Sequence, residues 1–85
     1  MKIDINTLRK YLESMEKLGY SDLGEYQNKY YLAKKIQEKF PALTEKIIYN
    51  AIEITNQTSK NTFLKKKYIT NLCKNLLSLY NYNNS

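Results

Sequence analysis

Histidine is absent from this chain of 85 residues, and cysteine occurs only once, at Cys73. Histidine is the commonest general base and the commonest metal ligand in proteins, so its absence removes most hydrolase arrangements and most transition-metal sites. A zinc site needs several Cys or His ligands, which this chain cannot supply. We therefore expect no metal and no cofactor.

Two other catalytic patterns are also missing. Gly19 and Gly24 are not followed by Lys-Ser or Lys-Thr, so they do not form a phosphate-binding loop. Glu13 and Glu16 lie one helical turn apart, but basic residues nearby favour a solvated ion-pair surface over a catalytic pair of carboxylates. The sequence therefore predicts a protein that is not an enzyme.

Turn-forming residues and long apolar runs are scarce. The chain has two glycines and one proline, which favours a few long helices over many short strands. No apolar run has the length of a signal sequence or a membrane span. We expect a single domain over residues 1–80 and a frayed tail over residues 81–85, in the cytoplasm. The lone Cys73 lies among leucines, and we expect a buried structural thiol in a reducing compartment.

Apolar residues recur at helical spacing in two segments of the first half of the chain. The first segment ends where Gly19 provides a residue for the left-handed conformation. The second starts at a cap on Ser21 or Asp22 and ends at Phe40, because Pro41 disfavours helical geometry in the residue before it. The expected inward positions are Ile5, Leu8, Leu12, Met15 and Leu18 in the first segment, and Leu23, Tyr26, Tyr30, Leu32, Ala33, Ile36 and Phe40 in the second.

Two further helices are expected in the second half. Thr44 is a suitable N-cap, and Leu43 with Ile48 can form a hydrophobic staple around it. Polar residues 56–61 are expected to form the longest loop, after which a helix starts at Asn61 or Thr62. The expected inward positions are Ile47, Ile48, Ala51, Ile52 and Thr55, then Ile69, Leu72, Cys73, Leu76, Leu77 and Tyr80. The fold class is thus all-α, a compact antiparallel bundle of about four helices with the last helix central.

Acidic residues are absent after Glu53. Residues 1–53 hold nine Lys or Arg and eight Asp or Glu, a balance of +1, whereas residues 54–85 hold five lysines and no acid, a balance of +5. The positive charge of the chain is therefore concentrated in its last third, at Lys60, Lys65, Lys66, Lys67 and Lys74.

Tryptophan is absent too, but the chain has nine tyrosines and two phenylalanines. Tyr11, Tyr26, Tyr30 and Tyr80 lie on or near the apolar stripes, and we expect them to be partly buried. Tyrosine is frequent in interfaces because it buries a large area with few rotatable bonds. The tyrosines outside the stripes are candidates for a partner surface: Tyr31, Tyr49, Tyr68 and Tyr82.

The predicted partner-binding residues are Lys60, Lys65, Lys66, Lys67, Tyr68, Lys74 and Tyr82. Lysines beside an aromatic residue suit phosphate backbones or anionic lipid headgroups, and a protein or membrane-associated partner is also open. The alternative interpretation is an ordinary solvated helix surface. Specific readers of DNA bases usually use several arginines, whereas this chain has only Arg9 and no helix-turn-helix spacing.

The order of segments from Leu32 to Tyr80 resembles that of the bacteriocin immunity proteins of lactic acid bacteria. The similarity lies in Lys46-Ile47-Ile48-Tyr49-Asn50-Ala51-Ile52, in the polar Thr58-Ser59-Lys60 and in the leucine-rich final segment. The resemblance implies an antiparallel four-helix bundle in the cytosol of the bacteriocin producer, guarding a membrane sugar transporter. It further implies that recognition falls on Lys60, Lys65, Lys66, Lys67, Tyr68 and residues 80–82.

Three functional hypotheses follow. The first is a small interaction protein, such as an immunity factor, that binds a protein partner at the cytosolic side of a membrane target. The second is a phage- or plasmid-type regulator that binds DNA or RNA through the same lysines. The third is a protein inhibitor of a bacterial enzyme. The oligomeric state stays open. A stripe containing Tyr31, Tyr49 or Ile54 could be the interface of a homodimer, or these could be apolar residues scattered over the surface.

Overall fold

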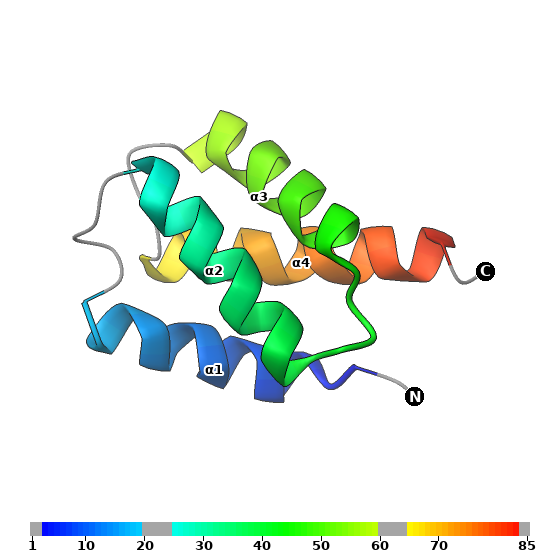
Figure 1. The fold of residues 1–85 in the computed structure, drawn as a ribbon, viewed down its shortest axis with the longest axis horizontal. Coiled ribbons are helices and arrows are strands. Elements are labelled where there is room, and N and C mark those ends of the chain that lie inside the picture. Colours follow the sequence, from blue (N-terminus) through cyan, green and yellow to red (C-terminus); the bar gives the residue numbers. More distant parts are fainter. Residues whose placement is uncertain (1–2, 20–24, 60–64, 84–85) are drawn as a thin grey trace.

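The computed structural model describes residues 3–19, 25–59 and 65–83, and these residues form four helices and no strand. The helices are α1 (Ile5–Lys17), α2 (Glu25–Lys39), α3 (Glu45–Ser59) and α4 (Lys66–Asn83). Successive helices run in alternating directions (Figure 1). The radius of gyration is 11.6 Å, close to the value of about 12 Å for a compact chain of this length. The predicted all-α bundle is confirmed.

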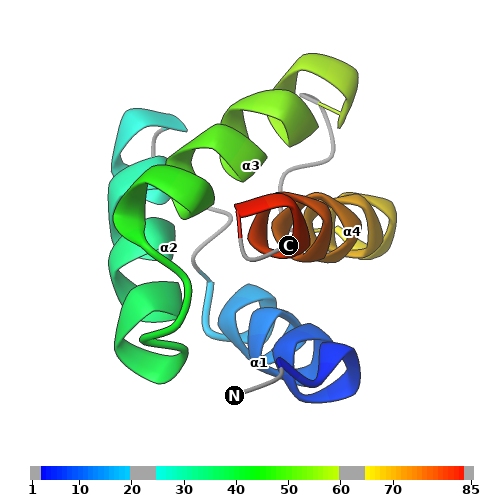
Figure 2. The same cartoon turned by 90° about the vertical axis from the view of Figure 1, so that its right-hand side faces the viewer.

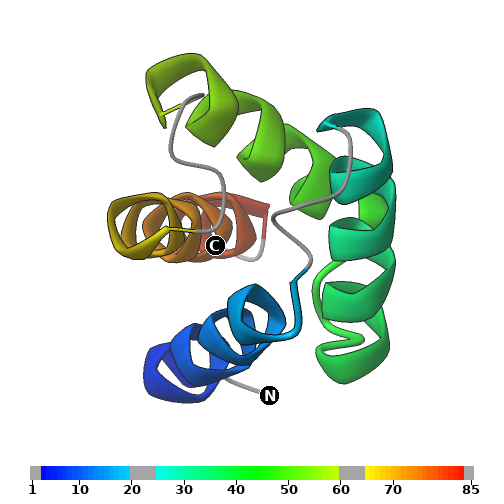
Figure 3. The ribbon, with the colours of Figure 1, turned by 90° about the vertical axis from the view of Figure 1, so that its left-hand side faces the viewer.

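Helices α3 and α4 make the most extensive contact of the bundle. Helix α4 also packs against α1, and α3 also packs against α2. The two end-on views place α2 and α4 on opposite sides of the molecule, with α1 and α3 between them (Figures 2 and 3). The cleanest apolar stripe of the sequence, in α4, is therefore covered by two helices, but α3 has two neighbours as well, so α4 is not the single central helix that was expected.

The core contains most of the apolar residues that the helical spacing predicted. Leu18 is the clearest exception, because it caps the C-terminus of α1 and is 75% exposed. Tyr30 is a second exception and is 47% exposed, so its predicted burial is wrong. The buried apolar residues are Leu8, Leu12, Met15, Leu32, Ala33, Ile36, Leu43, Ile47, Ile48, Ala51, Ile52, Tyr68, Ile69, Leu72, Cys73 and Leu76.

The ends of α1 follow from its capping residues. Asp4 accepts hydrogen bonds from the backbone N–H of Asn6 (3.0 Å) and from the hydroxyl of Thr7 (3.1 Å), which satisfies a donor of the first turn. Gly19 has a φ of 88°, a conformation that glycine adopts without steric cost. The predicted stop at Gly19 is confirmed. The predicted cap of α2, at Ser21 or Asp22, lies outside the described residues.

The start of α3 is also as predicted. The hydroxyl of Thr44 accepts a hydrogen bond from the backbone N–H of Ile47 at 3.3 Å. Leu43 and Ile48, on either side of this cap, are both fully buried. An N-cap and two apolar residues that enter the core together fix the direction in which the chain enters the helix.

The end of α3 differs from the expectation. A loop was predicted from Asn56 onward, but α3 continues to Ser59, and Thr55, Asn56 and Ser59 are buried. These three residues lie at three- and four-residue steps, so they extend the inward face of the helix with polar side chains. The loop prediction is therefore wrong for residues 56–59, because polar residues at helical spacing can be buried when they find partners.

The partners of these residues come from α4. The Asn75 amide donates to Thr55 Oγ1 at 2.8 Å, and the Asn71 amide donates to Ser59 Oγ at 3.2 Å. The Tyr68 hydroxyl donates to Asn56 Oδ1. We call these three pairs the polar seam. They join two helices that also share much of the apolar core, and they place the N-terminal half of α4 against the C-terminal half of α3.

The start of α4 could not be compared with the expectation, and its end differs from it. Its predicted start, Asn61 or Thr62, falls outside the described residues, and the described helix begins at Lys66. The helix continues to Asn83, so that residues 81–83 are helical with exposed side chains where a frayed tail was expected. Residues 84 and 85 lie outside the described part.

Candidate partner-binding surface

The lysines of α4 lie on the outside of the bundle. Lys65, Lys66, Lys67 and Lys74 are all exposed. Lys67 and Lys74 are seven residues apart, about two helical turns, so they share one side of the helix. Lys60, which was predicted to belong to the same surface, lies outside the described residues.

Acidic residues from α1 border the first of these lysines. Lys65 Nζ lies 3.6 Å from Glu16 Oε1, and both side chains are partly exposed, so the ion pair adds little to stability. A hollow of about 220 Å³ separates the two helices here and is lined by Glu13, Glu16, Lys17, Lys65, Lys66 and Ile69. The lysine-rich segment is free of acid along the sequence, but it is not free of acid in space.

Tyr68 does not belong to the surface. It was predicted to contact a partner, but its side chain is fully buried, and its hydroxyl donates a hydrogen bond to Asn56. Tyr68 lies four residues before the buried Leu72, so both residues face the core. The buried side of α4 therefore begins one residue earlier than the apolar pattern suggested, with an aromatic residue whose hydroxyl has a partner on α3.

Tyr82 is the exposed aromatic residue of α4. It is 80% exposed, whereas Tyr80 is half-buried against the core, as predicted. Five predicted residues are thus exposed, Lys65 just before α4 and four on the helix itself. We call the four on the helix the α4 face: Lys66, Lys67, Lys74 and Tyr82. The amides of Asn71 and Asn75, on the same helix, are held by their hydrogen bonds to α3.

A second group of exposed aromatic residues lies on α2. The rings of Tyr30 and Tyr31 contact edge to face, with centroids 5.5 Å apart and planes at 82°. Tyr31 is 43% exposed and Tyr49 of α3 is half-buried. Helical spacing alone could not place Tyr30, because a residue at the margin of a stripe is covered only if the neighbouring helix is close. Tyr26 lies outside the described side chains.

Tyr11, by contrast, is half-buried as predicted. Its hydroxyl donates to the backbone carbonyl of Lys35 at 3.1 Å, and its ring contacts Phe40 edge to face at 6.0 Å. These contacts join α1 to the C-terminal half of α2. Tyr11 therefore has a structural role.

Cys73 is a buried thiol, as predicted. Burial raises its pKa from 9.0 to about 11, against the opposing effect of the nearby Arg9 guanidinium. Reactive cysteines have a lowered pKa and an exposed setting, and Cys73 has neither. It belongs to the core and not to a reactive site.

The described residues contain no group of three or more Cys, His, Asp or Glu side chains placed to hold a metal ion. Within the same residues, no helix combines the length and the apolar character that crossing a membrane requires. No protein family, no curated protein and no solved structure matches the chain. The function must therefore be argued from the exposed surfaces.

Proposed function

We propose that the protein is a small, non-catalytic binding protein that captures an acidic protein partner through the α4 face. The observation that carries the proposal is a run of exposed lysines, Lys66, Lys67 and Lys74, on a helix that has no acidic residue and carries the exposed aromatic side chain of Tyr82. Charged groups at the edge of an interface guide association and select the partner, while an aromatic residue provides contact area.

The acidic residues of α1 support a protein partner over a nucleic acid. Glu16 lies 3.6 Å from Lys65, and Glu13 lines the same hollow as Lys66. A phosphate backbone that approached this end of α4 would be repelled by both carboxylates. A protein surface can instead place a basic residue beside them, so the mixed charges fit a protein partner better.

The resemblance to bacteriocin immunity proteins gives this proposal a specific form. In that form, the bundle is a rigid scaffold in the cytosol, and the α4 face contacts a protein at the cytosolic side of a membrane target. Because Tyr68 is buried and Lys65 is paired with Glu16, the contact residues of this proposal within the described part of the chain are Lys66, Lys67, Lys74 and Tyr82. An inhibitor of a bacterial enzyme would use the same surface. The identity of the captured protein, a membrane protein or an enzyme, distinguishes an immunity factor from an inhibitor.

The test is capture of a partner by the immobilised protein from the lysate and solubilised membranes of its native host. A variant with Lys66, Lys67 and Lys74 all changed to Glu should lose a partner that the unaltered chain retains. The substituted side chains are exposed, so the circular dichroism spectrum should not change.

A matched control carries the same change of charge on other helices, at Lys10, Lys39 and Lys46, which are also exposed. This control should keep the partner. Equal capture by the unaltered chain and the α4 variant would contradict the proposal, and equal loss from both variants would show that only net charge matters.

A second candidate function is binding of DNA or RNA. The observation that favours it is the exposed side of α4, where Lys67 and Lys74 lie about two helical turns apart and the helix has no acidic residue. Lysine side chains are common phosphate contacts. Such binding would weaken steeply with salt because each neutralised phosphate releases counterions. A mobility-shift titration with DNA and RNA at low and moderate salt distinguishes the two candidate functions. Absence of binding at low salt would exclude nucleic-acid binding.

A further inference from the structure

A second exposed surface lies along the border between the antiparallel helices α2 and α3 (Figure 1). It is lined by Tyr30, Lys34 and Gln37 of α2 and by Glu45 and Tyr49 of α3, around a hollow of about 210 Å³. We call these five residues the α2–α3 face. Pockets that bind small molecules are usually about 300–1,000 Å³, so this hollow is small for a metabolite. It is better suited to side chains of a protein.

Exposed aromatic residues are concentrated at this border. Tyr30 is 47% exposed, and Tyr31, whose ring contacts that of Tyr30 edge to face, is 43% exposed. Tyr49 is half-buried and lines the hollow. Tyrosine is enriched in protein interfaces because its ring provides contact area and its hydroxyl provides a polar atom. Tyr31 and Tyr49 are also two of the residues whose spacing in the sequence left a homodimer open.

The charges of α2 and α3 are of opposite sign and nearly cancel. Helix α2 holds four lysines and two glutamates, a balance of +2, whereas α3 holds one lysine and two glutamates, a balance of −1. Helix α4 holds three lysines and no acid, a balance of +3. A symmetric dimer pairs a surface with its own image. Two copies that met through α4 would therefore repel each other, whereas α2 of one copy attracts α3 of another.

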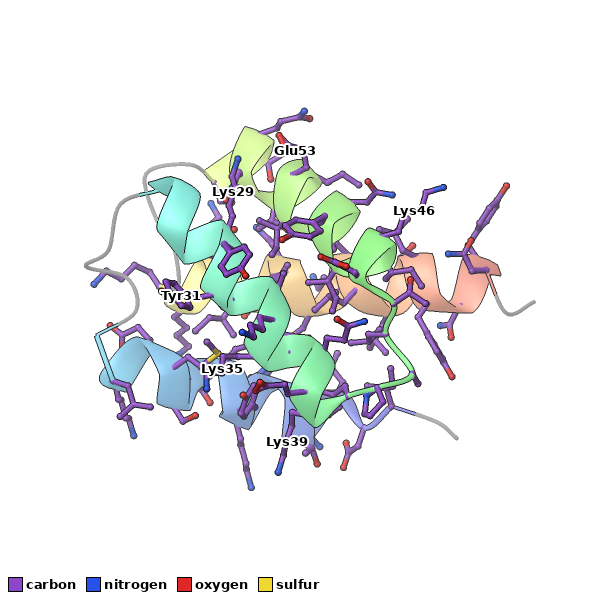
Figure 4. The ribbon with its side chains drawn as sticks, in the orientation of Figure 1. Lys29, Tyr31, Lys35, Lys39, Lys46 and Glu53 are labelled. Atoms are coloured by element: carbon purple, nitrogen blue, oxygen red, sulfur yellow. The ribbon has the colours of Figure 1, made fainter. Side chains whose placement is uncertain are left out.

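Lysines of α2 lie level with glutamates of α3 along this border. Lys29 Nζ lies 3.9 Å from Glu53 Oε1 (Figure 4). Further along the same two helices, Lys34 and Glu45 line the hollow. These two side chains form no ion pair with each other or with any other described residue. The α2–α3 face therefore offers one positive and one negative group to a partner.

A two-fold axis along the border would give both groups an opposite charge. Such an axis lies in the plane of contact, so it lays α2 of each copy over α3 of the other. Lys34 of one copy then meets Glu45 of the other, and the symmetry repeats the contact in the reverse direction. The ring of Tyr49, which lines the same hollow, lies beside this contact and suits a cation–π interaction with the incoming lysine.

Other occupants fit less well. Lys34 would attract an acidic segment or a phosphate backbone, but Glu45 would repel it, and the reverse holds for a basic segment. A single strand of nucleic acid needs open aromatic rings on which bases can stack, whereas the ring of Tyr30 is packed against that of Tyr31. A second copy of the chain presents both signs of charge, on the two helices that require them.

We infer that a second copy of the chain docks on the α2–α3 face, with α2 of each copy against α3 of the other and Lys34 of each beside Glu45 of the other. The end-on views place α2 and α4 on opposite sides of the bundle, so the α4 faces stay exposed in the dimer (Figures 2 and 3). The dimer can then hold one partner at two points, which raises the apparent affinity without a new contact. This role goes beyond capture by a single α4 face.

The test is sedimentation velocity of the full chain over a range of concentrations, which should show an equilibrium between monomer and dimer. Lys34→Glu and Glu45→Lys should each weaken the dimer about tenfold, because the symmetry turns one reversed charge into two repulsive contacts. Both side chains are exposed, so both variants should fold, which circular dichroism checks.

A mixture of these two variants tests the arrangement itself. In a mixed dimer, the acid introduced by Lys34→Glu faces the lysine introduced by Glu45→Lys, and the unaltered Glu45 and Lys34 face each other. The mixture should therefore dimerise about as tightly as the unaltered chain, although each variant alone is weakened. A contact within one chain would give no such rescue.

Two controls compare this surface with α4. Tyr30→Ala should weaken the dimer about tenfold, as expected for an aromatic interface residue, whereas Tyr82→Ala, which removes the exposed ring of α4, should not change it. The variant with Lys66, Lys67 and Lys74 changed to Glu should still dimerise. This result would distinguish the inference from the function proposed for α4.

Several outcomes would overturn the inference. A chain that stays monomeric at millimolar concentration has no such interface. A dimer that neither charge reversal weakens uses another surface, and a dimer that the mixture does not restore lacks the contact between Lys34 and Glu45. Binding of a different protein or of a nucleic acid at Tyr30 and Lys34, by a chain that remains monomeric, would assign the surface to that occupant.

Discussion

Asn56 and Tyr68 form a buried polar pair whose energy depends on both members. The Tyr68 hydroxyl donates to Asn56 Oδ1, while Asn56 Nδ2 is buried and has no hydrogen-bond partner among the described residues. A buried polar atom without a partner costs free energy. Loss of the hydrogen bond from Tyr68 would therefore leave both polar atoms of the Asn56 side chain without a partner. The pair also explains why an aromatic residue predicted to contact a partner lies in the core.

Removing the hydroxyl of Tyr68 isolates this effect. Tyr68→Phe keeps the ring but leaves the Asn56 carbonyl oxygen buried without its donor, and we expect the free energy of unfolding to fall by about 1–3 kcal/mol. Urea denaturation followed by circular dichroism measures this. Tyr82→Phe is the control, since Tyr82 is 80% exposed and the change should cost less than about 0.5 kcal/mol. Equal stability of the two variants would argue against a buried Tyr68.

The ionisation of the buried Cys73 thiol should make the free energy of unfolding depend on pH in the alkaline range. Burial raises its pKa from 9.0 to about 11, so the folded state favours the neutral thiol. The resulting stabilisation is fully present below pH 9 and is lost as the pH rises through about 11. The free energy of unfolding should therefore fall more steeply between these values in the unaltered chain than in Cys73→Ala. Parallel pH profiles would show that the thiol is not buried in this way.

At the scale of elements, the described helices follow from signals that are local in the sequence. Gly19 ends α1, Thr44 begins α3, and the apolar stripes of α1, α3 and α4 mark the core, because capping and periodicity act within a few residues. The C-terminal end of α3 could not be predicted in this way. Asn56 and Ser59 are polar, and their burial depends on partners on α4 that local spacing does not indicate.

Amide hydrogen exchange tests this end of α3. The amides of residues 56–59 should be protected to a degree similar to that of Ile52, because they are hydrogen-bonded in a helix that is held by the polar seam. The amides of residues 81–83, at the exposed end of α4, should exchange much faster. If residues 56–59 exchanged as fast as residues 81–83, the predicted loop would be correct and the helical extension would not.

At the scale of the whole molecule, the candidate surfaces could be predicted only in part, because they depend on how the helices pack together. Lysine count and the absence of acid after Glu53 identified Lys66, Lys67 and Lys74 from the sequence, and their exposure agrees. The sequence could not indicate that Glu13 and Glu16, some fifty residues earlier, border Lys65 and Lys66. It also could not bring α2 and α3 together at Tyr30 and Tyr49. Contacts between helices depend on the packing of the bundle, which the pattern of one helix does not contain.

The central claim is that the α4 face contacts the protein partner. It is tested most directly by acetylating exposed lysines of the chain, alone and bound to the captured partner, and measuring each modification by mass spectrometry. We expect Lys66, Lys67 and Lys74 to be protected in the complex, and Lys10, on α1, to be modified equally in both states. Unchanged modification of the three α4 lysines in the complex would contradict the account.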